Sequence, residues 1–233
     1  MRSLVALTAL AAVLAVGAGS AGAARECDGL MVCIPVAGPW VVVPAAGGVP
    51  RPEVEYYLSC PRGHVVGGLD AELSHRPIDV GFRGLLGSPV NPGITTSRAA
   101  VFLASYVGAR RARGLTFRPH IGCIPGTGGG TRIPTANSAF QPGQPTVRRV
   151  RTVRARPGTA TVAQGCRAGE RLVGAHHAFG FFMRRPPRAS LVGSVSGTRS
   201  IRGGRVVVRV RGDAELDDVR AVVQVQAVCA VQQ

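Results

Sequence analysis

The chain has 233 residues, of which 45% are hydrophobic, and its formal net charge is +16 at pH 7. This length suffices for one large domain or for two domains of ordinary size. Arginine, proline and glycine interrupt every apolar run after residue 24, which excludes a membrane span in the mature chain. The chain has no lysine, and this preference for arginine is typical of GC-rich bacterial genomes, so codon usage explains part of the charge.

Residues 1–24 have the three parts of a secretory signal peptide. Arg2 gives a positive start, an apolar run covers Leu4 to Val16, and Ala21-Gly22-Ala23 is a small-x-small cleavage motif. We expect cleavage after Ala23 or Ala24, and an N-terminal anchor that stays attached is the alternative. The mature chain is therefore expected to be secreted, either extracellular or periplasmic.

Six cysteines in an exported chain are expected to form disulfides. Four of them define two frames of equal length, and the second frame begins 106 residues after the first. Because related modules should close in the same way, the spacing predicts three bridges: Cys60–Cys123, Cys166–Cys229 and Cys27–Cys33. A zinc site is disfavoured, since neither C-x-x-C nor H-x-x-x-H occurs.

Alternating apolar and polar residues predict a series of half-buried strands. In chain order the predicted strands are 40–43, 54–60, 65–69, 99–107, 115–123, 205–211 and 219–229. The last two are expected to form a hairpin across 212–218. In the final strand, Gln224 and Gln226 are expected on the outward polar face. Residues 75–93 contain three prolines and are expected to be loop-rich.

No window of a dozen residues shows a helical stripe. Many short strands separated by glycine and proline turns predict an all-β fold made of two tandem, disulfide-closed modules, each a β-sandwich or jelly-roll-like domain. The expected organisation is a signal peptide (1–24), a first β module with an N-terminal clasp (25–125), a Gly/Pro-rich linker (126–146) and a second, basic β module (147–233).

Two short motifs carry a resemblance. Cys60-Pro-Arg-Gly63, followed by Val-Val-Gly-Gly68, resembles the start of a cysteine repeat in exported proteins of GC-rich bacteria, and Gln226-Ala-Val-Cys-Ala230 resembles its end. The second start, Cys166-Arg-Ala-Gly169, lacks the proline, and the first end, Ile121-Gly-Cys-Ile124, departs from the pattern. The resemblance implies export and β structure, and it lends no activity.

The arginines are unevenly distributed. From Arg25 to Cys123 ten arginines stand against seven acidic residues, whereas 124–233 contain seventeen against five. Codon usage should act on both modules alike, so the second module is distinctly basic. Its guanidinium groups are expected to bind phosphate, sulfate or carboxylate through paired hydrogen bonds. The predicted anion-binding residues are Arg148, Arg149, Arg151, Arg154, Arg156, Arg184, Arg185, Arg205, Arg209 and Arg211.

These features predict a secreted, non-enzymatic binding protein or a cell-envelope-associated protein. Its expected partners are anionic cell-envelope polymers or lipid headgroups, and an unspecific solvated basic face is the alternative. A specific nucleic-acid partner is not expected, because the aromatic side chains that stack on bases are scarce. No cofactor is predicted, and the oligomeric state is left open.

Several other motifs have weaker interpretations. Adjacent strand residues point to opposite faces, so His176 and His177 are not expected to chelate one metal ion, and no metal site is predicted. Arg211-Gly212-Asp213 is the tripeptide that adhesion receptors bind, near the predicted hairpin tip. Gly193-Ser-Val-Ser-Gly197 misses the G-x-S-x-G spacing by one residue. A secreted hydrolase with its site in the loops 75–93 and 180–200 is the alternative function.

Overall fold

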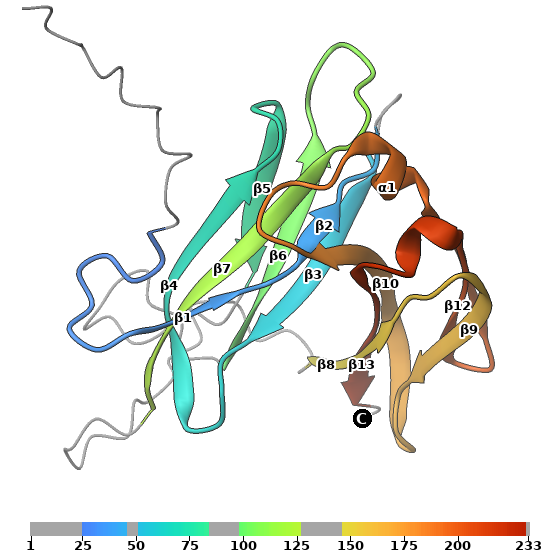
Figure 1. Ribbon diagram of the computed structural model, residues 1–233. Helices are drawn as coiled ribbons and strands as arrows, with labels where there is room; N and C mark the ends of the chain where they lie inside the picture. Colours follow the sequence, from blue (N-terminus) through green and yellow to red (C-terminus); the bar gives the residue numbers. More distant parts are fainter. Residues whose placement is uncertain (1–24, 46–50, 84–97, 127–145, 232–233) are drawn as a thin grey trace, which may run out of the picture.

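The computed structural model describes residues 25–45, 51–83, 98–126 and 146–231, and strands dominate them (Figure 1). The first half contains β1 (Ile34–Ala37), β2 (Trp40–Val42), β3 (Glu53–Ser59), β4 (His64–Leu73), β5 (Ile78–Arg83), β6 (Ala99–Tyr106) and β7 (Thr116–Pro125). The second half contains β8 (Thr146–Arg154), β9 (Gly158–Gly165), β10 (Glu170–Phe182), α1 (Ala189–Gly193), β11 (Val195–Arg202), β12 (Arg205–Gly212), the 3-10 helix η1 (Ala214–Leu216) and β13 (Arg220–Val231). The predicted all-β class is confirmed. The predicted signal peptide and most of the predicted linker lie outside the described residues.

Each half is a sandwich-like pair of antiparallel layers. In the first half, sheet β3-β6-β5 packs against β4, β7 and β2, and in the second half, sheet β9-β12-β11 packs against β10 and β13. One disulfide closes each sandwich, with Cα–Cα distances of 5.7 Å for Cys60–Cys123 and 5.6 Å for Cys166–Cys229. The third bridge, Cys27–Cys33, closes the loop before β1. All three predicted bridges are confirmed, and each long one contributes about 4 kcal/mol in the chain-entropy model.

The halves share strand order and register. Strands β4 and β10, like β6 and β12, begin 106 residues apart and occupy equivalent places in their sheets. The ladder of β4 with β7 shifts between Val66 and Gly68. The ladder of β10 with β13 shifts at the equivalent place, between Leu172 and Gly174. A bulge at the same position in both ladders bends the two sheets in the same way.

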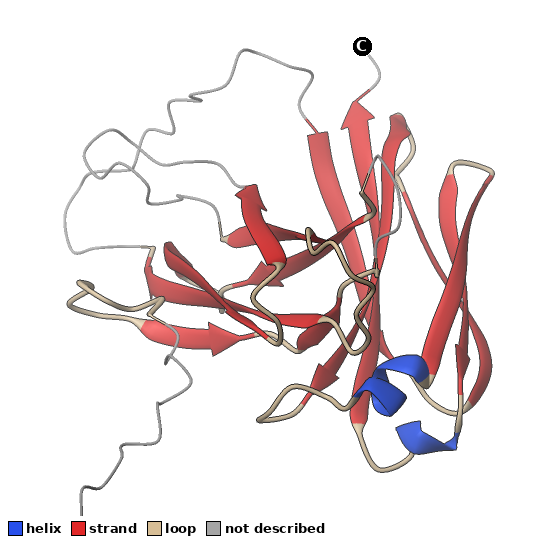
Figure 2. Ribbon diagram, turned by 90° about the horizontal axis from the view of Figure 1, so that it is seen from above, coloured by secondary structure: helices blue, strands red, loops and turns tan. Residues whose placement is uncertain are grey.

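One seven-stranded sheet runs through both halves. Its order is β1-β7-β2-β10-β13-β8, and β4 pairs with the other edge of β7. Strand β2 forms the connection, since Val41 lies opposite Phe117 of β7 on one side and Gly180 of β10 on the other. Val41 belongs to the first core, whereas its neighbour Val42 packs against the second. The two cores therefore lie on opposite faces of a shared sheet. Figure 2 shows α1 and η1 together at one end of the second half.

Gln224 and Gln226 of β13 cover the open edge of β3, and the expectation that they face solvent is wrong. Their exposed fractions are 3% and 0%. The Tyr57 N–H donates to Gln224 Oε1 at 2.7 Å, and Gln224 Nε2 donates to the Tyr57 carbonyl at 3.0 Å. Gln226 Nε2 donates to the Glu55 carbonyl at 3.0 Å. An edge strand exposes unpaired backbone groups, so these two amides satisfy the edge of β3 and join the halves.

Two further expectations are corrected. Strands β12 and β13 do not form a hairpin, because β12 pairs with β9 and β11 while β13 belongs to the shared sheet. The segment between them, which includes η1, crosses from one layer to the other. The region 75–93 is not loop throughout, since β5 occupies Ile78–Arg83 and pairs with β6.

Replacement of Gln226 by leucine should lower the free energy of unfolding by about 1–3 kcal/mol, because it leaves the buried Glu55 carbonyl unpaired. Urea unfolding of the full chain measures this change. Gln164→Leu is the matched control, since Gln164 is half-buried on β9 and its side chain, among the described residues, bonds only the Gly165 carbonyl. That control should change the value by no more than about 0.5 kcal/mol. Equal effects of the two substitutions would contradict a specific role for the amides at the junction.

Candidate functional site

The basic run 148–156 does not form a single surface, because β8 alternates its side chains between two faces. Arg148 points toward the first half, where its Nη1 lies 2.5 Å from Glu55 Oε2 and 2.5 Å from Gln226 Oε1. The Glu55 side chain is almost fully buried. Arg148 therefore neutralises a buried carboxylate at the junction of the halves and is not free to bind an anion.

Arg149 projects from the opposite face of β8 and pairs with Glu170 of β10. Its Nε donates to Glu170 Oε2 at 2.9 Å, its Nη2 contacts Oε1, and the Arg167 N–H donates to Oε2 at 2.9 Å. The Arg149 hydrogen bond, with that of Arg167, lowers the pKa of Glu170 to about 2, and the same pairing raises the pKa of Arg149. The Sγ atoms of Cys166 and Cys229 lie near this carboxylate, but they are bonded to each other and are not free to ligate a metal ion.

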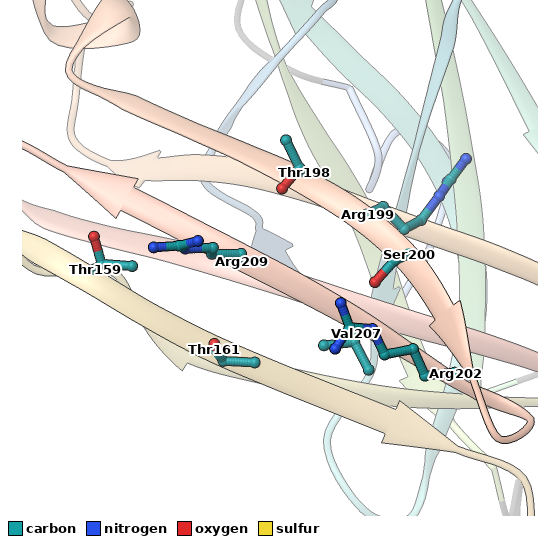
Figure 3. A pocket seen from close by; sticks show the side chains of 8 residues that line it. All are labelled: Thr159, Thr161, Thr198, Arg199, Ser200, Arg202, Val207 and Arg209. Atoms are coloured by element: carbon teal, nitrogen blue, oxygen red, sulfur yellow. The ribbon is translucent and has the colours of Figure 1, made fainter.

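The outer face of the sheet β9-β12-β11 carries a groove of about 540 Å³ (Figure 3). Val206, Val208 and Val210 turn inward from β12 into the second core, so the intervening side chains stand on the outer face, as the alternation predicts. The lining is mainly hydroxyl and guanidinium: Thr159, Thr161, Thr198, Arg199, Ser200, Arg202, Val207 and Arg209. The Arg199 guanidinium reaches away from it to the Ala175 carbonyl.

Strand register places Arg209 and Arg211 between hydroxyl side chains. Two cross-strand rows each have an arginine flanked by two hydroxyl residues, Thr161–Arg209–Thr198 and Thr159–Arg211–Ser196. Arg205 of β12 lies opposite Arg202 of β11. We call the whole set the arginine–hydroxyl face, and it consists of Thr159, Thr161, Ser196, Thr198, Ser200, Arg202, Arg205, Arg209 and Arg211.

The positive charge of the arginine–hydroxyl face is not neutralised within the described part of the chain. No acidic side chain described there forms an ion pair with Arg202, Arg205, Arg209 or Arg211. Successive outward residues on one strand are about 7 Å apart. Guanidinium and hydroxyl donors at this spacing can hydrogen-bond phosphate, sulfate or carboxylate oxygens, and anions repeated along a chain can contact successive rows.

The ten predicted anion-binding arginines thus divide into three groups. Arg148 and Arg149 are held in ion pairs. Three lie on the arginine–hydroxyl face: Arg205, Arg209 and Arg211. The remaining five are exposed along or just after β8, or between β10 and α1: Arg151, Arg154, Arg156, Arg184 and Arg185. Arg202 and the hydroxyl side chains were not predicted. The spacing of Ser196, Thr198 and Ser200 at every second residue is typical of a strand with one polar face and could have identified them.

His176 and His177 face opposite sides of β10, as predicted. His176 Nδ1 lies 3.5 Å from Glu55 Oε1. Burial lowers the pKa of His176, although the negative charge of Glu55 acts to raise it. His177 packs edge-on against Phe179, with ring centroids 5.5 Å apart. Burial, with the charge of Arg199, lowers the pKa of His177 to about 4. The two rings do not share a ligand position.

The loops predicted for the alternative hydrolase are only partly described, since 84–97 lie outside the described residues. In the second loop, Ser194 is buried and its Oγ donates to the Leu191 carbonyl at 2.7 Å. At the start of the first, His75 Nδ1 lies 2.9 Å from the Oγ of the preceding residue, Ser74. A catalytic triad also needs a carboxylate that orients the base, and among the described residues none contacts His75.

The tripeptide 211–213 is not presented at a hairpin tip. Gly212 is buried, and a Cβ at this position would lie 2.4 Å from Leu216 Cδ1. The Asp213 carboxylate accepts the Glu215 N–H at 2.9 Å and caps η1. The tripeptide therefore belongs to the segment that connects β12 in one layer to β13 in the other.

No protein-family model, curated protein or solved structure matches this chain. Within the described ranges, no helix has the length and apolar character needed to span a membrane.

His177 should make stability depend on pH between about 6.5 and 4. The folded protein holds this ring neutral down to about pH 4, whereas the unfolded chain takes up its proton near pH 6.5. The free energy of unfolding should therefore fall as pH decreases through this window. His177→Asn should flatten the fall, and His75→Asn, at an exposed turn position, should not. An unchanged slope in the His177 variant, measured by urea unfolding at several pH values, would contradict the assignment.

Proposed function

We propose that this is an exported, non-enzymatic binding or cell-envelope-associated protein that binds anionic polymers through the arginine–hydroxyl face. The observation that carries the proposal is the groove of about 540 Å³, where arginines stand among hydroxyl groups without acidic partners in the described structure. Arginine binds planar oxyanions through paired hydrogen bonds, and neighbouring hydroxyls add donors for the remaining oxygens. The expected partner is therefore a polymer that carries repeated oxyanions, and the expected function is to bind it.

Export is part of the same proposal. Residues 1–24 have the composition of a cleavable signal peptide, and the three disulfides suit an oxidising compartment. An exported protein with this surface meets anionic wall polymers and lipid headgroups. Nucleic acid is disfavoured, because no aromatic side chain that could stack on bases belongs to the arginine–hydroxyl face.

We further propose that the two halves are a tandem repeat in which the second copy has become the binding module. Common strand order, a common register shift and equal disulfide loops support this. The second half carries most of the excess arginine. The equivalent sheet of the first half, β3-β6-β5, uses its β3 edge for contact with β13. One module therefore binds while the other supports it.

Binding of the full mature chain to immobilised poly(glycerol phosphate), a teichoic-type polymer, tests the proposal. The double variant Arg202→Ser/Arg209→Ser should raise the Kd at least about tenfold, which corresponds to a loss of about 1.4 kcal/mol. Arg184→Ser/Arg185→Ser removes the same charge from exposed positions outside the face and is the matched control. It should change the Kd much less, and binding by the native chain should weaken as salt passes 0.1 M, where the Debye length is about 10 Å.

Equal loss in the two double variants would mean that net charge alone causes retention, and the proposed face would be wrong. Absence of binding by the native chain at low salt would contradict the proposal as well. Phosphatidylglycerol vesicles provide a second arm, which distinguishes a lipid surface from a wall polymer as the source of the phosphate groups.

A further inference from the structure

The backbone nitrogen of Arg25 contacts a carboxylate on the shared sheet. Arg25 N lies 2.6 Å from Asp70 Oδ2, and the other Asp70 oxygen accepts the Ala71 N–H at 2.7 Å. Asp70 is half-buried on β4. Because the acceptor is an ionised carboxylate, this hydrogen bond is charge-assisted.

The residues after Arg25 fix its position. The Glu26 carbonyl oxygen occupies the space of a side chain at two glycines, since a Cβ would lie 1.9 Å from it at Gly68 and 2.0 Å at Gly122. The Glu26 carboxylate is buried, with Oε1 3.5 Å from His120 Nδ1. The Cys27–Cys33 bridge then closes the loop. The Arg25 nitrogen is therefore held against the sheet by packing, by the buried contact of Glu26 with His120 and by a disulfide.

We propose that Asp70 is the receptor for the N-terminal ammonium group that signal-peptide removal creates between Ala24 and Arg25. Hydrolysis of this peptide bond consumes one water, leaves a carboxylate on Ala24 and frees an amine on Arg25, which takes up a proton. Gly22 and Ala24 give this bond the small-x-small pattern of a cleavage site. The inference depends on the proposed export only for the event that frees Arg25.

Cleavage changes the group that faces Asp70 from a neutral amide to a charged ammonium. An amide offers one N–H and no net charge, whereas an ammonium offers three N–H groups and a full positive charge. The other titratable groups on the packed elements are the Arg25 guanidinium, Glu26, Asp28, His64, Glu72, Arg118 and His120. Among the described residues, only Asp70 hydrogen-bonds to the Arg25 nitrogen. Cleavage after Ala23 would instead put the charge one residue away from this carboxylate.

The chain contains no lysine, so its N-terminal ammonium is its single primary amine. A reagent that acylates amines therefore reports on this one group, and the pH dependence of labelling gives its pKa. In the experiment, the full-length chain, including residues 1–24, is expressed in a bacterial host. The secreted protein is collected, and its intact mass identifies its first residue. A chain that begins at Arg25 after release from a cleavable fusion partner tests the receptor even without secretion.

The intact mass should correspond to a chain that begins at Arg25. Its amine should show a pKa about 1–2 units above the ordinary 7.7–8.0 of an α-amino group. Asp70→Asn keeps the shape and should return the pKa to that range, while Asp79→Asn, at an exposed position on β5, should leave it raised. Retention of all three disulfides shows that each variant is folded.

A secreted chain that begins at any other residue would overturn the assignment of the cleavage site. An amine with the same pKa in the native chain and in Asp70→Asn would overturn the receptor. A chain extended by Ala24 gives an independent check that leaves Asp70 in place, and its amine should have an ordinary pKa. Polymer binding should be the same for all of these chains, so failure here is distinguishable from failure of the arginine–hydroxyl face.

Discussion

The whole structure depends on the pairing of β2 with both β7 and β10. Side chains of an extended strand alternate between faces, so three residues are enough to serve two cores on opposite sides of one sheet. Val41 is fully buried in the first core, and Val42 packs against the second. Burial of one valine contributes about 1.5–3 kcal/mol, and Ala178 of β10 also enters the first core. Neither half completes its packing alone.

The shared sheet also determines which charges remain available. Because the cores lie on opposite faces, the sheet β9-β12-β11 presents its outer face away from the first half (Figure 1). Arg148 lies at the junction and neutralises Glu55, and Arg149 is held by Glu170. The arginines of the outer face have no such partners among the described residues. Strand register explains why Arg209 and Arg211 stand in rows with threonine and serine.

Local patterns predicted the features that depend on local periodicity. The cysteine spacing identified all three bridges, and alternation placed Val206, Val208 and Val210 in the core. Residues whose environment comes from distant segments were not predictable in this way. The strand pattern places Gln224 on a polar outward face, whereas in the structure it is hydrogen-bonded to Tyr57, which is 167 positions away in the sequence. Strand β5 was missed because the prolines of 75–93 favoured a loop, although Ile78, Val80 and Phe82 alternate with polar residues or glycine. The basic run 148–156 looked like one surface because nothing in the run itself reveals its partners on β3 and β10.

Cleavage of the connection between the halves tests the central claim most directly. A specific protease site placed within 127–145 cuts the chain between the two disulfide frames, and none of the three bridges links the products. If β2 and the two glutamines join the halves in one sheet, the cut protein should elute as a single species in size-exclusion chromatography without reductant, and should unfold in one transition. Two fragments that separate under native conditions, each folded by itself, would contradict the shared sheet.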